Sequence, residues 1–221
     1  MTGATDPAVT IGDITRFRVV PVIVLSDSKV AVPLGAALAE AGLQVAEITL
    51  RTKSGLDSIH AMAENKDLLV GAGTITQPEQ VEQAVEAGAR FLVSPGVLSE
   101  IISEARRLGV PILPGVATPT DILVAISHGI HTVKFFPAET SGGVLALKAL
   151  AAPFPNIQFV PTGGIGPANL SDYLAVPAVA AVGGSWMVPA DALNTGDLAR
   201  VTHLCRAAVA SASVNDSPHG S

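Results

Sequence analysis

The chain has 221 residues, 48% of them hydrophobic and 14% charged, with a formal net charge of -6. This composition predicts a globular protein with a large core. No cluster of basic residues exceeds the pair Arg106 and Arg107, which argues against nucleic acid or a membrane surface as a partner. The single cysteine, Cys205, allows no internal disulfide, and neither a basic-apolar leader nor a long apolar span is visible. We therefore expect a cytoplasmic protein.

A short helix is predicted first, because Ile11, Ile14 and Phe17 share one side of it. Eight apolar runs with β-strand character follow. They begin at Val19, Val45, Leu68, Phe91, Pro111, Thr132, Phe159 and Ala180. Because consecutive starts lie 20 to 27 residues apart, one helix and two loops fit between each pair of strands.

Nearly unbroken apolar strands alternating with amphipathic helices predict an α/β fold with a parallel sheet. The count of eight favours closure into a (β/α)8 TIM barrel with an extra N-terminal helix. An open doubly wound sheet is the alternative, but no glycine-rich dinucleotide turn follows the first strand. Pro33 predicts a kink or a late start in the helix after that strand. We expect one domain over residues 1–221, with disorder at 1–6 and 211–221.

Lys134 is the only charged residue of the apolar run TVKFFPA (132–138). Burial among phenylalanines disfavours the ammonium form, so a neutral amine becomes available for attack on a carbonyl. The alternative is a lysine whose stem lies along the core and whose head reaches water. Glu47 is the only carboxylate inside a predicted strand, the second, which lies opposite the sixth strand in a barrel of eight. We therefore expect Glu47 and Lys134 to face each other across the interior. A purely structural ion pair is the less favoured reading, since such pairs add little net stability.

Other polar groups follow the strands at their carboxyl ends, where barrel enzymes keep their active sites. Arg51 lies beyond Glu47 near the predicted mouth, where a guanidinium binds a carboxylate or phosphate, although an exposed loop arginine fits this position equally well. Thr74 follows the third strand and offers a hydroxyl. Pro95 and Gly96 follow the fourth strand, where the backbone allows close approach.

Two Gly-Gly pairs end the seventh and eighth strands, and both precede a helix or a helical turn. Exposed N–H groups of paired glycines approach anions closely, and the loops after these two strands often bind phosphate in such barrels. The donors would be the backbones of Gly163, Gly164, Gly184 and Ser185, with the Ser185 hydroxyl assisting. The alternative is that the glycines only ease the turn from strand to helix. The histidines show no metal-ligand spacing, so we expect neither a metal nor another cofactor.

Six motifs occur in order along nearly the whole chain: EITLRT (47–52), GAGT (71–74), SPG (94–96), KFFPAE (134–139), PTGGI (161–165) and GGSW (183–186). Together they resemble the family of 2-keto-3-deoxy-6-phosphogluconate (KDPG) aldolase and 4-hydroxy-2-oxoglutarate (KHG) aldolase. The resemblance implies a metal-independent class I aldolase with a (β/α)8 fold and an extra N-terminal helix. It also implies a homotrimer and a phosphorylated keto acid as substrate, cleaved to pyruvate and glyceraldehyde 3-phosphate in Entner-Doudoroff-type catabolism.

The resemblance also implies roles for individual residues. Lys134 matches the Schiff-base lysine and Glu47 the general acid/base, while Arg51 and Thr74 match the contacts to the pyruvate carboxylate. The remaining matches are the pocket wall (Pro95 and Phe136), a substrate-orienting threonine (Thr162) and the phosphate site (Gly163, Gly164, Gly184 and Ser185).

Three alternatives stay open at this point. The aldehyde half of the substrate would differ in a KHG aldolase, and one hydroxyl would differ in a 2-keto-3-deoxy-6-phosphogalactonate aldolase. The Gly-Gly pairs favour a phosphorylated substrate over KHG. A barrel that binds a phosphorylated metabolite without covalent chemistry, or a phosphate-barrel isomerase, would form no adduct with pyruvate.

Overall fold

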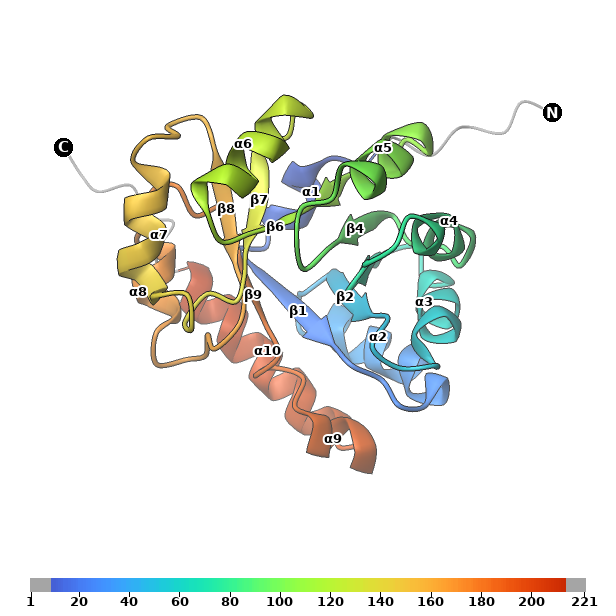
Figure 1. Ribbon diagram of the computed structural model, residues 1–221. Coiled ribbons are helices and arrows are strands. Elements are labelled where there is room, and N and C mark those ends of the chain that lie inside the picture. Colours follow the sequence, from blue (N-terminus) through green and yellow to red (C-terminus); the bar gives the residue numbers. More distant parts are fainter. Residues whose placement is uncertain (1–8, 214–221) are drawn as a thin grey trace.

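Parallel strands form the centre of the computed structural model, which describes residues 9–213 (Figure 1). Each of the eight predicted apolar runs contains a strand, because these residues bury their side chains on both faces of a sheet. The strands are β1 (Val19–Ile23), β2 (Val45–Thr49), β3 (Leu69–Gly73), β4 (Phe91–Val93), β5 (Ile112–Leu113), β6 (Gly115–Val116), β7 (Thr132–Phe135), β8 (Gln158–Pro161) and β9 (Val182–Gly184).

The strands are arranged in two parallel sheets. Six of them form a curled sheet in the order β5-β4-β3-β2-β1-β9, and the other three form a sheet in the order β6-β7-β8. A parallel bridge between Thr162 and Gly183 connects the end of β8 to β9. Pro114 alone separates β5 from β6 and divides the fifth predicted run, because proline has no N–H to donate to a ladder. The predicted α/β class with parallel strands is confirmed.

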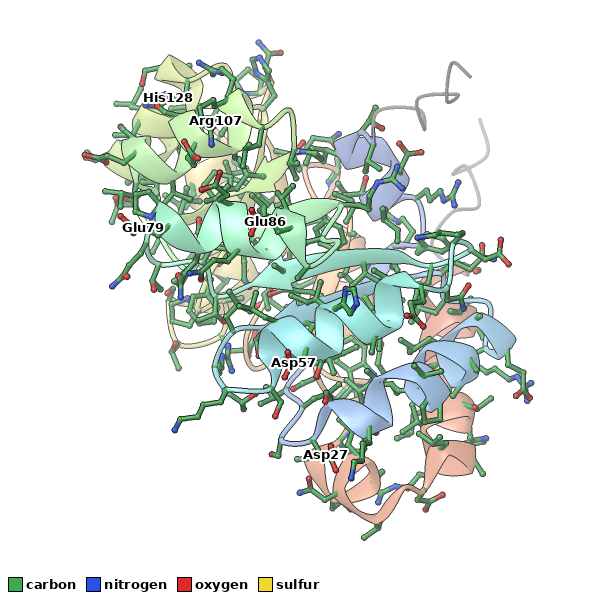
Figure 2. All side chains as sticks on the ribbon, turned by 90° about the vertical axis from the view of Figure 1, so that its right-hand side faces the viewer. Asp27, Asp57, Glu79, Glu86, Arg107 and His128 are labelled. Carbon is green, nitrogen blue, oxygen red and sulfur yellow. The ribbon has the colours of Figure 1, made fainter. Side chains whose placement is uncertain are left out.

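Helices surround the strands on the outside (Figure 1). They are α1 (Ile11–Thr15), α2 (Ala31–Glu40), α3 (Gly55–Ala63), α4 (Glu79–Glu86), α5 (Ser99–Arg107), α6 (Pro119–Ser127), α7 (Gly143–Ala151), α8 (Leu170–Leu174), α9 (Ala190–Thr195) and α10 (Leu198–Ser213), with a 3-10 turn η1 (Ser28–Val30). Their charged faces point outward, as Figure 2 shows for Glu79, Glu86 and Arg107, which are all exposed. Apolar residues such as Val81 and Ala84 of α4 are buried against the sheet.

Two predictions about helix boundaries have clear outcomes. Pro33 lies in the first turn of α2, after η1, where its missing N–H costs no intrahelical bond, so the late start is confirmed. The prediction that disorder begins at residue 211 is wrong, because residues 211–213 form the last part of α10 and Ala212 is buried there. The rest of that tail, 214–221, and the expected disordered segment 1–6 lie outside the described residues.

The strand register places the two central side chains of the predicted site. Glu47 of β2 pairs with Val22 on one side and with Gly71 on the other. Lys134 of β7 pairs with Gly115 and Val160 in the second sheet. The two residues therefore belong to different sheets, and only the packing of these sheets against each other brings their side chains together.

Candidate active site

Lys134 and Glu47 form a buried ion pair. The Nζ of Lys134 lies 3.3 Å from Oε1 of Glu47, and the two residues are only 5% and 4% exposed. The Phe136 ring lies beside the amine, with 5.2 Å between Nζ and the ring centroid. The prediction that Glu47 and Lys134 face each other is confirmed. The reading in which the lysine head reaches water is wrong, because the head is paired inside the protein.

Gly73 makes room for the Glu47 carboxylate. A β-carbon added to Gly73 would lie 2.2 Å from Oε1 of Glu47, closer than any real contact, so only glycine fits beside this carboxylate. Gly71, on the same strand, likewise leaves room for the ring of Phe91. Thr74 of the GAGT motif was among the predicted site residues, whereas Gly73 was not. The glycine alternation of that motif was the available signal, since alternate residues of a strand share one face.

Arg51 and Thr74 contact each other at the carboxyl ends of β2 and β3. The Nε of Arg51 donates a hydrogen bond to Oγ1 of Thr74 over 3.3 Å. Thr74 has a φ of 63°, a left-handed conformation that is unfavourable for a β-branched residue. Such strain is concentrated at functional sites. Arg51 is exposed and lies beyond the end of β2, so its position depends on the following turn and not on strand alternation.

Pro95 lies one strand away from Lys134. A β-carbon added to Gly115 would lie 2.2 Å from the carbonyl oxygen of Pro95, so the two backbones are in close contact. Gly115 in turn pairs with Lys134 in the sheet register. Ser94, which is buried, donates from Oγ to the carbonyl of Gly96 over 2.7 Å and shapes the turn after β4. The structure thus brings Pro95 to the neighbourhood of the lysine.

The loop after β8 is connected to the β7 end that carries the lysine. The N–H of Thr162 donates to the carbonyl of Phe135 over 2.9 Å, and the carbonyl of Thr162 accepts from Ala138 over 2.9 Å. Thr162 is buried, whereas Gly163 is half-buried and Gly164 is exposed. Both glycines have positive φ, 103° and 79°, which suits glycine.

The second Gly-Gly pair lies beside the first. The bridge between Thr162 and Gly183 holds the two loops together, and a β-carbon on Gly183 would lie 2.3 Å from Oγ1 of Thr162. The indole of Trp186 covers Gly184, where a β-carbon would lie 1.7 Å from the ring. Ser185 is exposed between them. The four predicted anion donors therefore come from two adjacent loops.

Two further features, a metal centre and a membrane-spanning helix, are absent from the described part of the chain. Within residues 9–213, no three His, Cys, Asp or Glu side chains are grouped so that they could hold a metal ion. None of the helices in this range is both long and apolar enough to cross a membrane.

A model of one protein family matches residues 11–204, and its description is KDPG and KHG aldolase. This range contains every residue of the site described above. The chain belongs to the KDPG and KHG aldolase family.

Relatives within this family share close to half of their residues with the chain. A KHG/KDPG aldolase of Escherichia coli K12 is 47% identical over 197 residues, which cover 89% of this chain and 92% of the relative. A 2-dehydro-3-deoxy-phosphogluconate aldolase of Dickeya dadantii is 46% identical over 200 residues, with 90% and 94% covered.

A solved KDPG aldolase of Legionella pneumophila superposes with a TM-score of 0.87 at 39% identity, covering 90% of this chain and 98% of that one. That structure contains pyruvate captured at low pH as a covalent carbinolamine intermediate. KDPG and KHG aldolases thus include a member whose covalent chemistry with pyruvate has been observed.

Proposed function

We propose that this protein is a class I aldolase that cleaves KDPG to pyruvate and glyceraldehyde 3-phosphate, with Lys134 as the Schiff-base nucleophile. The observation that carries the proposal is the buried pair of Lys134 and Glu47, 3.3 Å apart. A buried ion pair adds little net stability, so a chemical role explains its cost better than a structural one. The covalent pyruvate adduct of the Legionella pneumophila relative supports the same chemistry.

The first half of the reaction forms the protonated imine. Transfer of a proton from Lys134 to Glu47 across their 3.3 Å contact leaves a neutral amine and a carboxylic acid. The neutral amine attacks the C2 carbonyl of the substrate. As the C–N bond forms, the C=O π bond breaks, and a proton passes from the nitrogen to the oxygen to give a carbinolamine. Glu47 then protonates the departing hydroxyl, water leaves, and the imine nitrogen carries a positive charge that withdraws electrons from C3.

The second half breaks the carbon-carbon bond. The Glu47 carboxylate, now free of its proton, removes the proton of the C4 hydroxyl, and the electrons of the C3–C4 bond move towards the imine. Glyceraldehyde 3-phosphate leaves, and the enamine of pyruvate remains on Lys134. A proton returned from Glu47 to C3 and hydrolysis of the imine release pyruvate and the free lysine.

The surrounding residues would bind the two ends of the substrate. Arg51 and Thr74, which contact each other, would bind the carboxylate next to the reacting carbon, since guanidinium–carboxylate bonds are strong. Phe136 and Pro95 would form the apolar wall of the pocket, and Thr162 would orient the substrate.

The phosphate ester would lie at the two Gly-Gly loops. The N–H groups of Gly163, Gly164, Gly184 and Ser185 would donate to it, together with the Ser185 hydroxyl. Gly164 and Ser185 are exposed, so an anion can reach them from solvent.

We further infer the larger organisation of the protein. The Thr162–Gly183 bridge and the single residue between β5 and β6 support closure of both sheets into one (β/α)8 barrel, preceded by α1 as the extra helix, in a single domain. Exposed apolar side chains, including Leu123, Ile126 and Leu145, support burial against further copies in the homotrimer expected from the family. We propose the cytoplasm as the place of action.

KHG is a second candidate substrate, because the Escherichia coli relative is named for both activities. KHG carries a carboxylate where KDPG carries the phosphorylated chain, so it would use Lys134 and Glu47 but would make less use of the Gly-Gly loops. Comparison of the two substrates in one assay would rank them.

Borohydride reduction of the protein mixed with pyruvate tests the chemistry. An adduct should appear in the intact mass, and peptide mapping should locate it on Lys134. Lys134→Ala should form no adduct and show no cleavage, whereas Lys148→Ala, which removes an exposed lysine of α7, should behave like the wild type. A folded wild-type protein without an adduct would contradict the Schiff-base mechanism and favour the barrel that binds a phosphorylated metabolite without covalent chemistry.

A further inference from the structure

Glu139 connects the segment that carries Lys134 to the Gly163–Gly164 loop and to α8. It lies between β7 and α7, and its N–H donates to the carbonyl of Gly163 over 3.1 Å. Its Oε1 accepts a 2.5 Å hydrogen bond from the hydroxyl of Tyr173 on α8. Tyr173 is the only tyrosine of the chain and is fully buried.

The two ends of the Glu139 side chain have different neighbours. Its methylene part packs on Gly164, where an added β-carbon would lie 2.6 Å from Cβ and 2.7 Å from Cγ. Its carboxylate lies at the first residue of α7, where a β-carbon on Gly143 would be 3.2 Å from Oε1 and 3.6 Å from the Tyr173 hydroxyl. The side chain therefore touches the proposed phosphate loop with its apolar part while its charge points to α7 and Tyr173.

This orientation is electrostatically favourable. The start of α7, a helix of nine residues, carries a partial positive charge that stabilises a carboxylate. Burial, and then the hydrogen bond to Glu139, raise the pKa of Tyr173 well above its usual range, so the phenol stays protonated and remains a donor. The phenol donates its hydrogen bond to the Glu139 carboxylate.

We propose that Tyr173 is a positioning residue that holds the Glu139 carboxylate away from the Gly163–Gly164 loop and thereby sets the affinity of this loop for a phosphate group. The inference rests on the proposed function, because it takes this loop as the phosphate site. Without the hydroxyl, the carboxylate loses its partner and is free to rotate about its own bonds towards the N–H groups of the loop. There it would repel a phosphate dianion and compete for the same donors.

Inorganic phosphate is the probe for the test, since it needs no turnover. The amide signals of Gly163 and Gly164 are followed by NMR during a phosphate titration of four full-length proteins: wild type, Tyr173→Phe, Glu139→Gln and the double variant. Thr202→Val serves as a matched control, because it also removes a buried hydroxyl that donates to a single acceptor, but on α10, where that acceptor is the Ala37 carbonyl.

Tyr173→Phe should weaken phosphate binding about five-fold to ten-fold, the effect of a carboxylate brought within several ångströms of the anion at a partly exposed site. The double variant should bind like Glu139→Gln, because a neutral amide has no charge to keep away, and Thr202→Val should bind like the wild type. In turnover, Tyr173→Phe should raise KM for KDPG with little change in kcat. The rate of adduct formation with pyruvate, which has no phosphate, should not change.

Three results would overturn the inference. The first is wild-type affinity in Tyr173→Phe. The second is a double variant as weak as Tyr173→Phe, which would make the effect one of packing and not of charge. Absence of any phosphate response at Gly163 and Gly164 in the wild type would overturn both the phosphate site and the inference. The borohydride adduct on Lys134 would still decide the Schiff-base function separately.

Discussion

The Nζ of Lys134 lies 3.3 Å from Oε1 of Glu47, although 87 positions of the sequence separate the two residues. One residue belongs to β7 and the other to β2, in different sheets. Both are almost fully buried, and they form an ion pair with each other. In this arrangement the amine proposed as nucleophile and the carboxylate proposed to accept and return protons lie close enough to act on the same substrate atoms.

Replacement of Glu47 should separate adduct formation from cleavage. Glu47→Gln keeps the shape of the side chain but removes its ability to accept a proton, so kcat for KDPG should fall by about 100-fold to 10,000-fold. The variant should still be trapped on Lys134 by pyruvate and borohydride after prolonged incubation. Steady-state kinetics and peptide mapping measure both effects. A kcat within a few-fold of the wild type would remove Glu47 from the mechanism.

Gly73→Ala should impair catalysis although it replaces neither Lys134 nor Glu47. The added methyl group would lie 2.2 Å from Oε1 of Glu47 and must push the carboxylate aside. Displacement by about 1 Å costs on the order of 100-fold in rate, so a loss of kcat of this size is expected. Gly12→Ala in α1 is the control, since its β-carbon would meet nothing closer than 3.5 Å. If Gly73→Ala kept full activity, Glu47 would not need its present position.

Arg51→Met should weaken recognition of the keto acid. The guanidinium is held by Thr74, and loss of a hydrogen bond to a charged group costs about 1.5–3 kcal/mol, which corresponds to a KM roughly 10-fold to 150-fold higher. The pyruvate concentration needed for half-maximal trapping by borohydride should rise in parallel. Arg206→Met, which removes an exposed arginine paired with Glu40 on the helices α10 and α2, should leave both values unchanged. An unchanged KM in Arg51→Met would assign the carboxylate to another donor.

Cys205 should be unreactive in the folded protein. Burial raises the pKa of its thiol to about 12, so the nucleophilic thiolate is not formed near pH 8. A disulfide reagent such as DTNB should therefore label the protein only after unfolding in urea. Rapid labelling of the native protein would show that α10 opens readily.

The same raised pKa implies a pH effect on stability. Above the ordinary pKa of a thiol, 9.0, the unfolded chain releases this proton while the folded chain keeps it up to about pH 12. The contribution of Cys205 to the free energy of unfolding is thus complete below pH 9 and declines as the pH rises. Urea unfolding at pH 8 and pH 10 should show a smaller alkaline loss in Cys205→Ala than in the wild type.

Much of the fold was predictable because its signals are local. Eight apolar runs at regular intervals require only neighbouring residues to be recognised, and each of them contains a strand. The division of the fifth run at Pro114 follows from a missing N–H group, a signal that the sequence itself contains. The end of α10 was placed too early, because small and polar residues at 211–213 indicated a tail while the burial of Ala212 favours helix.

In the candidate site, too, some residues could be predicted from the sequence and others could not. Lys134 and Glu47 were recognisable in the sequence because each is an isolated charge in an apolar strand, and such a charge needs a partner. They lie on predicted strands that face each other across a barrel, so each is the expected partner of the other. Gly73 and the Glu139–Tyr173 hydrogen bond did not stand out. Their importance lies in contacts between strands and loops, and a sequence pattern does not report the distance between such side chains.

The order of elements and the choice of Lys134 and Glu47 as candidate site residues therefore follow from residue type and spacing, which encode local conformation and solvation cost, whereas the kind of chemistry was implied by the resemblance of six motifs to KDPG aldolases. Three contacts are specified by tertiary packing alone. The Lys134 amine lies 3.3 Å from Glu47, and Arg51 donates a hydrogen bond to Thr74. Tyr173 donates a hydrogen bond to the carboxylate of Glu139, whose methylene part packs on Gly164. The reason is that these contacts join segments from different strands and helices. Their geometry depends on how the close-packed interior fits together.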